Sequence, residues 1–242
     1  MPLKIFISAS LLMLAPVVMA QPDFGGLWFP AGFDPNAPRL APGTREMPFN
    51  DTARQMFEQY DASFDISDEP GGWCIKPGLP RSIWGAPFPV EIVQTDSFIN
   101  MLWEGYFQYR KIYLEGHPRP EPVLHTSMGY SVGHFEGDTL VIETSYLAEY
   151  PYMRRTPNTE DATVVERWNI VTQAGADGSE QRFLTNEMIM TDARLYTAPV
   201  RIVGTLRYSP DTPILEYSCS EGIYDLHLQE KGLQIPDFST LD

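Results

Sequence analysis

Most of this chain after its first third is a series of short stretches in which apolar and polar residues alternate. In 163–170, for example, Val164, Glu166, Trp168 and Ile170 share one face. An alternation with a period of two predicts β-strands that turn one side toward a core. Further strand-like runs are at 90–95, 98–103, 107–114, 127–135, 139–145, 182–190, 199–208 and 213–220.

Turn signals separate several of these runs. Asp96-Ser97 is short enough for a two-residue hairpin, and Glu136-Gly137-Asp138 places a glycine where positive φ is easiest. Pro210-Asp211-Thr212 marks another turn. We therefore predict an all-β fold of about nine antiparallel strands, either a lipocalin-like barrel or a sandwich.

The region before the strands is expected to hold one helix. Asn50 or Asp51 can cap a helix over 50–62, in which Ala53, Phe57 and their neighbours have helical spacing. This helix is expected to lie on a sheet or to close a barrel end. Residues 65–89 are rich in proline and glycine and are predicted to be loops.

The first twenty residues have the composition of a secretory signal peptide. Lys4 precedes an apolar run over 5–18, and Val18-Met19-Ala20 is a small-x-small cleavage site. An uncleaved anchor is the alternative, disfavoured because the run is short for a span of about 20 residues. We therefore expect a signal peptide over 1–20, a single barrel domain over 21–242, and a periplasmic or secreted protein.

Export bears on the two cysteines, Cys74 and Cys219. In an oxidising compartment a disulfide between them is the default expectation, with two free buried cysteines as the alternative. A cysteine nucleophile is disfavoured because neither residue has a Cys-His signature around it.

Charge and missing motifs exclude several function classes. The formal net charge of −15 disfavours duplex DNA or an anionic membrane as a partner. The sequence contains no P-loop, no dinucleotide fingerprint, no Gly-x-Ser-x-Gly elbow and no zinc motif. We therefore expect no cofactor and no metal, although His117, His125 and His134 lie near Glu136 and Asp138 and keep a metal site open as an alternative.

Two resemblances bear on the fold. Gly26-Leu27-Trp28 resembles the Gly-x-Trp that opens the first strand of lipocalins and other calycins, in which the tryptophan plugs one barrel end. Over residues 73–222 the chain also resembles a family of exported bacterial proteins. The matching motifs are Cys74–Arg81, Pro89–Thr95, Tyr109–Gly116, Gly129–Val141, Val165–Arg167 and Leu215–Glu221.

We know of no common activity for that family, so the second resemblance implies an architecture and no catalytic residues. Both cysteines lie inside matching motifs, which supports their pairing. The chain departs from the family pattern around 146–161, where Tyr146, Tyr150, Tyr152, Arg154 and Arg155 gather. That stretch is expected to carry what is particular to this protein.

Charged residues on apolar strand faces are the best candidates for chemistry. Arg110 shares a face with Ile112 and Leu114, and Glu166 lies among Val164 and Trp168. A charge that points into a barrel needs a partner, so an Arg110–Glu pair could orient a substrate. The alternative is that these residues face solvent. For Glu143 and Glu187 we favour that alternative, and we read Glu136-Gly137-Asp138 as a turn rather than a pair of catalytic acids.

Three function hypotheses follow. The first is a cofactor-independent acid–base enzyme, a lyase, isomerase or hydrolase, that acts on a small aromatic compound, for instance a lignin-type compound. Its candidate catalytic residues are Arg110, Glu166, Tyr109, Tyr130 and His125. The second is a lipocalin-like periplasmic carrier of an aromatic or apolar ligand. The third is an envelope interaction module whose barrel is filled by side chains. The sequence leaves the oligomeric state open.

Overall fold

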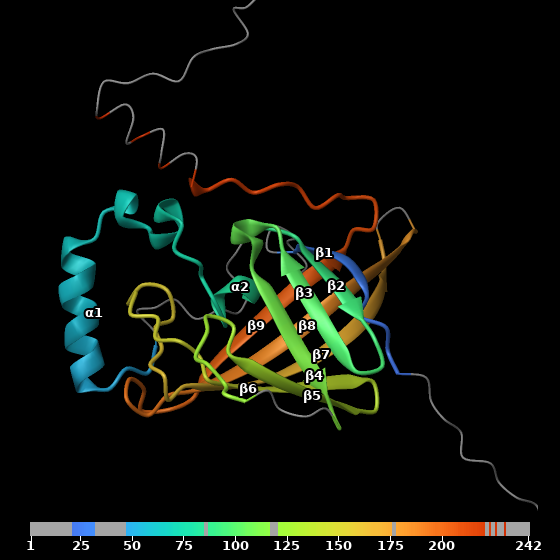
Figure 1. Cartoon of the computed structure of the whole chain (residues 1–242), viewed down its shortest axis with the longest axis horizontal. Coiled ribbons are helices and arrows are strands. Elements are labelled where there is room, and N and C mark those ends of the chain that lie inside the picture. The colour runs from blue at the N-terminus through green and yellow to red at the C-terminus, as the bar shows by residue number, and fades with distance from the viewer. Residues whose placement is uncertain are drawn as a thin grey trace, which may run out of the picture.

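The computed structural model describes residues 21–31, 47–84, 87–116, 121–175 and 178–220, together with residues 223, 226 and 230. The predicted signal peptide, His117 and His227 lie outside these residues. Nine strands close into a barrel in sequence order (Figure 1). They are β1 (Gly26–Pro30), β2 (Val90–Gln94), β3 (Phe98–Trp103), β4 (Tyr109–Leu114), β5 (Tyr130–Glu136), β6 (Thr139–Ser145), β7 (Thr163–Ala174), β8 (Glu180–Thr191) and β9 (Val200–Tyr208).

The prediction of an all-β barrel with one short helix is confirmed, but the prediction of antiparallel pairing throughout is wrong at one place. β4 and β5 are parallel, with Ile112 opposite Ser131. The chain between them returns along the length of the barrel, so that both strands start at the same end. The other eight neighbouring pairs are antiparallel, and β1 closes the ring on β9 with Trp28 opposite Tyr208.

The predicted alternation places the expected side chains inside. Ile112 and Leu114 on β4, and Val164 and Trp168 on β7, are buried. The predicted turns at 96–97 and 136–138 also form, and Gly137 adopts φ +60°. The predicted strand at 213–220 is wrong: this segment pairs with no strand. A closed ring offers no free strand edge for it to join.

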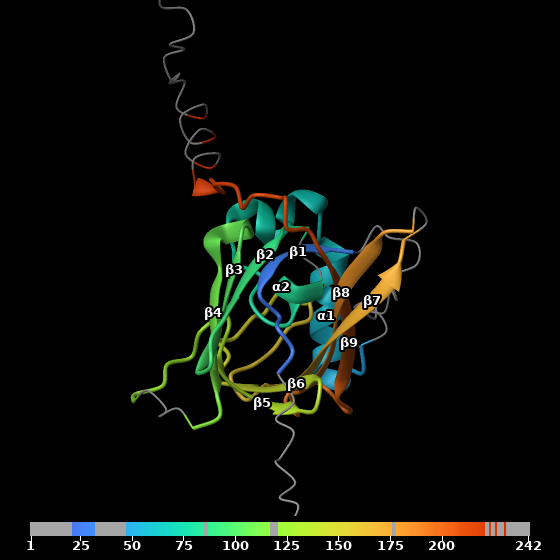
Figure 2. The ribbon, with the colours of Figure 1, turned by 90° about the vertical axis from the view of Figure 1, so that its right-hand side faces the viewer.

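The barrel has two different ends. The hairpin end carries the turns between β2 and β3, β5 and β6, and β7 and β8. Phe24 and Trp28, both fully buried, pack there, with the Phe24 ring 6.4 Å from that of Trp168. Figure 2 looks onto the hairpin end and shows the strands surrounding the interior, with helix α1 (Asp51–Ser63) behind them.

The opposite end, which we call the helix end, is covered by α1 and by the longer connections (Figure 1). Asn50 caps α1 as predicted, because its side chain accepts a hydrogen bond from the Ala53 N–H at 2.9 Å. Ala53 and Phe57 are buried, and the Phe57 ring stacks on Phe49 at 5.7 Å. The helix therefore covers a barrel end, which is one of the two predicted positions.

Residues 65–89 contain more structure than the loops that the sequence predicts. The structure has the short helices η2 (Ile66–Asp68), η3 (Pro70–Trp73) and α2 (Arg81–Trp84), and a further 3₁₀ turn, η4 (Gly105–Phe107), joins β3 to β4. Helices of one turn are too short to show a periodic pattern in a sequence. Their effect is to bring Glu69 and Arg81 to the helix end.

A disulfide between Cys74 and Cys219 confirms the predicted pairing, with the two Cα atoms 5.7 Å apart. After β9 the chain runs extended along the barrel toward the helix end, where the disulfide joins it to the end of η3 (Figure 1). On the way the Leu215 N–H donates to Glu104, and the Tyr217 ring lies 4.9 Å from that of Tyr106. No helix in the described part of the chain is long and apolar enough to span a membrane.

Candidate functional site

Arg110 and Glu166 meet inside the barrel. Arg110 Nη2 donates to Glu166 Oε1 at 2.5 Å and to Thr144 Oγ1 at 2.9 Å. Arg110 Nε donates to Ser131 Oγ at 3.1 Å. Glu166 Oε2 also accepts from the indole of Trp168 at 2.9 Å and from the Asn186 amide at 3.0 Å. We call these six side chains the interior network.

The interior network spans five consecutive strands, β4 to β8, and every member is at most 2% exposed. Its one buried polar atom without a partner is Asn186 Oδ1. The predicted Arg110–Glu pair therefore exists, but both residues are enclosed by packed side chains such as Ile112, Ile142 and Met188. This arrangement explains the two charges as core groups that satisfy each other. A catalytic role for them stays a prediction.

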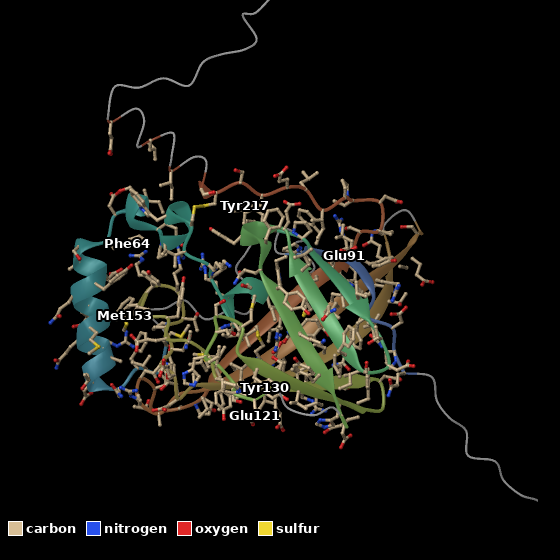
Figure 3. All side chains as sticks on the ribbon, in the orientation of Figure 1. Phe64, Glu91, Glu121, Tyr130, Met153 and Tyr217 are labelled. Carbon is tan, nitrogen blue, oxygen red and sulfur yellow. A yellow bond between two sulfur atoms is a disulfide. The ribbon has the colours of Figure 1, made fainter. Side chains whose placement is uncertain are left out.

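Tyr109 and Tyr130 lie on the outside of the barrel. Tyr109 is 54% exposed and donates to Asn100 Oδ1 at 2.7 Å. Tyr130 stacks on Tyr113, with ring centroids 5.4 Å apart, and lies along the lower side of the barrel in Figure 3. The structure does not bring either tyrosine together with Arg110. Odd-numbered residues of β4 point away from the interior, and so does Tyr130 on β5, where the neighbouring Ser131 points inward.

His125 is in the connection between β4 and β5, at the helix end. Its Nδ1 lies 3.3 Å from Glu160 Oε1, and its ring lies 5.4 Å from that of Tyr146. His134 is at the other end of the barrel, where it faces Glu136 at 3.4 Å. Within the described residues, no three His, Cys, Asp or Glu side chains are grouped so that they could hold a metal ion.

A pocket at the helix end, which we call the helix-end pocket, has a volume of about 690 Å³. Residues of α1 form one wall and residues within 149–159 form the other, with Arg194 and Leu195 completing it. Its apolar groups include Met56, Tyr60 and Met153. Figure 3 shows Met153 beside α1.

A smaller pocket of about 210 Å³ adjoins it, lined by residues 75–79 and by Ser127. The two pockets share Glu149, Tyr150, Pro151 and Asn158, so Tyr150 forms part of the wall between them. A third pocket, of about 570 Å³, is at the hairpin end and is lined mainly by polar residues of β8, β9 and the chain that follows. Methionine side chains line the helix-end pocket and are absent from this third pocket.

Two arginines share one glutamate next to these pockets. Arg155 Nε donates to Glu69 Oε2 at 2.6 Å, and Arg81 Nη2 lies 3.4 Å from Glu69 Oε1. We call these three residues the helix-end cluster. Burial, and then the positive charge of Arg155, lower the pKa of Arg81.

Two tyrosines border the helix-end cluster. Burial raises the pKa of Tyr150 to about 12, against the opposing effect of Arg81. Burial and a hydrogen bond with Tyr217 raise the pKa of Tyr106, whose hydroxyl donates to the Gly71 carbonyl at 2.8 Å. Both phenols therefore stay protonated at neutral pH and can donate a hydrogen bond.

Unusual backbone conformations also gather at the helix end. Among the described residues, those other than glycine with φ in the left-handed region are Cys74, Tyr106, Phe107, Tyr146 and Thr156. All five are in connections at this end. Such conformations cost about 1–3 kcal/mol each and concentrate at ligand-binding and active sites. For Thr156, which is β-branched and buried, φ is +57°.

Part of this site lies in segments with a sequence signal. Tyr150 and Arg155 lie in the stretch 146–161 that departs from the family pattern, and Arg81 ends the motif that starts at Cys74. Glu69 was missed, because a single acid in a proline-rich stretch carries no pattern. Comparisons of the chain with protein-family models, with curated proteins and with solved structures find no match. Fold and site together define a nine-stranded barrel with an aromatic-lined pocket over one end.

Proposed function

We propose that the protein is an exported barrel that binds a small aromatic compound at its helix end, as a carrier. The observation that carries this proposal is the helix-end pocket. A volume of about 690 Å³ lies within the range of small-molecule sites, which are mostly apolar with a few polar groups. Tyr60 and Tyr150 can stack on an aromatic ring, and methionines such as Met56 and Met153 adapt to its shape.

The interior of the barrel is a poor alternative location for a ligand. Residues from all nine strands fill it, including Trp28, Met101, Trp168 and Met188, each at most 1% exposed. Opening space there would require the removal of well-packed apolar side chains. The proposed carrier therefore differs from a lipocalin, because its ligand lies over the barrel and not within it.

Export is supported by the disulfide, since such bonds persist in oxidising compartments. The disulfide also fixes η3 beside the pockets, because Cys74 directly follows that helix and directly precedes the residues that line the smaller pocket. A preorganised pocket wall lowers the entropy that a ligand must lose on binding.

Binding of simple aromatic compounds to the disulfide-bonded protein, measured by calorimetry, tests this proposal. Met56→Glu places a charge at the pocket on a side chain that is 50% exposed. It is expected to weaken binding about tenfold, because a charge in an apolar site must be desolvated. Val93→Glu is the matched control, since Val93 is also 50% exposed but lies on the outside of β2. Equal effects of the two substitutions, or no binding of any aromatic compound, would contradict the proposal.

A second candidate function, acid–base catalysis on the bound compound, has one specific observation in its favour. Glu160 faces His125 Nδ1 at 3.3 Å, and a carboxylate in that position orients the ring so that Nε2 can accept a proton. Turnover that is lost in His125→Gln, with binding retained, would support an enzyme. His134→Gln is the matched control, because His134 also faces a glutamate but at the hairpin end.

A further inference from the structure

The helix-end cluster holds more positive charge and more hydrogen-bond donors than Glu69 can use. A guanidinium has five N–H donors. Among the described residues, the Arg81 side chain donates one hydrogen bond, a long one to Glu69 Oε1 at 3.4 Å. The Arg155 guanidinium uses two nitrogens on the other oxygen of the same carboxylate. Two positive charges thus face one negative charge.

This excess is not a solvated surface feature. The side chains of Arg81, Arg155 and Glu69 are only 17%, 28% and 21% exposed. Desolvation of the Arg81 guanidinium favours an additional anionic partner over water, because the charge is partly removed from solvent.

A further buried donor lies near α2. Ser82, which follows Arg81 in the chain, donates to Gln108 Oε1 at 2.7 Å. This contact fixes the Gln108 amide, whose Nε2 has no acceptor within the described part of the chain although the residue is 2% exposed. One buried donor next to this short helix is thus without an acceptor in the described residues.

Tyr150 connects the helix-end cluster to the pockets. The charges of Arg81, Glu69 and Arg155 all act on the pKa of its phenol. Its side chain lines both the helix-end pocket and the smaller pocket. Its backbone is fixed by reciprocal hydrogen bonds with Asn158, at 2.9 and 3.1 Å. The chain also links the cluster to the smaller pocket, because Leu79 and Tyr152 line that pocket and Arg81 and Arg155 follow them by two and three residues. A compound whose ring stacks at Tyr150 would therefore lie beside the segments that carry the two guanidinium groups.

We propose that Arg81 and Arg155 bind the carboxylate of the ligand, so that the protein's ligands are small aromatic carboxylates; this inference rests on the proposed binding function. A carboxylate is favoured among anions because these two arginines already hold one, that of Glu69, with one oxygen toward each guanidinium. Arginine forks match the planar geometry of this group. A singly charged ligand also suits a chain of net charge −15, which repels polyanions.

The experiment compares 3-phenylpropanoate with its methyl ester and with 3-phenylpropanol, using the disulfide-bonded protein and calorimetry. We expect the acid to bind at least about tenfold more tightly than the two neutral compounds. Arg155→Gln should weaken binding of the acid about ten- to a hundredfold and leave the alcohol unchanged. Arg81→Gln should act in the same direction. Arg167→Gln is the matched control, because it removes an equal charge from an exposed arginine that pairs with Glu136.

Glu69→Gln should tighten binding of the acid about threefold or more, since it removes a competing negative charge at constant shape, and should leave the alcohol unchanged. Equal affinities for the acid and the alcohol would overturn the carboxylate assignment while the binding function stands. An equal loss of affinity for the acid and the alcohol in Arg155→Gln would also overturn the carboxylate assignment and leave the binding function standing. Failure of all three compounds to bind would overturn the binding function and this inference together.

Discussion

Arginine meets glutamate both in the interior network and in the helix-end cluster, and the two are built in opposite ways. In the interior network, Glu166 accepts from Arg110, Trp168 and Asn186, and Arg110 has two hydroxyl partners besides. In the helix-end cluster, Glu69 is shared by Arg81 and Arg155. The first cluster is closed and balanced, whereas the second has spare donors and borders a pocket.

Burial of a charge therefore does not by itself identify a functional site. More informative is whether the opposite charges and hydrogen-bond acceptors around the group use all of its donors. A buried ion pair whose groups are all satisfied is explained by the core that surrounds it. A partly exposed cluster with unused donors can gain a partner from solution. The two clusters should therefore respond differently to substitution, in stability for the first and in binding for the second.

The largest effect is expected for Arg110→Met, which leaves Glu166 as a buried charge without its main partner. We expect the free energy of unfolding to fall by about 3–5 kcal/mol, measured by urea denaturation. Arg167→Met removes an exposed arginine at the hairpin end and should cost less than about 1 kcal/mol. Equal free energies of unfolding for the two variants would show that the interior network does not stabilise the fold.

Removal of the disulfide in Cys74→Ser/Cys219→Ser should come next. The bond closes a loop with a sequence separation of 145 residues, and its loss should lower the free energy of unfolding by about 2–4 kcal/mol. Because the disulfide holds η3 and the chain after β9, ligand affinity should fall as well. Reduced wild-type protein should show both changes. An unchanged affinity would show that ligand binding in the helix-end pocket does not depend on the disulfide.

The raised pKa of Tyr150 predicts a smaller, pH-dependent effect. Its folded-state pKa of about 12 lies above the ordinary value of 10, so its contribution to stability is complete below pH 10. That contribution is lost as the pH rises through 12. In Tyr150→Phe, the loss of stability over this interval should be smaller by about 1 kcal/mol, after allowance for partial exposure. An ultraviolet titration of tyrosinate should also lose a late step, and identical curves for the two proteins would contradict the assignment.

The smallest expected effect on stability is that of Arg155→Gln. Glu69 keeps Arg81 as a partner, and the pair is partly exposed, so the free energy of unfolding should change by about 0.5 kcal/mol or less. Urea denaturation is again the measurement. A loss of 2 kcal/mol or more would place the helix-end cluster with the interior network and remove the contrast between them.

Much of the barrel could be predicted because its strands follow local rules. Alternation fixes which side of β4 and β7 faces inward, and Gly137 marks a turn that only its backbone freedom makes easy. The direction of β5 relative to β4 has no such local signal, because it depends on where the connecting chain returns. Similarly, 213–220 has the composition of a strand, and only closure of the ring by β1 and β9 excludes it.

The candidate site was harder to predict because its parts come from distant segments. Glu69, Arg81, Tyr150 and Arg155 are brought together by short helices and loops, which have no periodicity. Patterns did predict that Arg110 and Glu166 share apolar faces, and pairing inside the barrel followed from the cost of burying a charge. Whether such a pair lines a cavity depends on how the remaining side chains fill the interior, which no single strand reveals.

The single parallel pair of strands has a consequence in simple counting. Around any closed ring of strands the number of direction reversals must be even, so nine strands cannot all be antiparallel to their neighbours. At least one pair must be parallel, and here it is β4 and β5. The chain between them must therefore travel back to the helix end, where Thr126 donates to Tyr146 and Ser127 accepts from Leu79. The odd strand count thus brings Ser127 into the lining of the smaller pocket, and the same connection places His125 opposite Glu160.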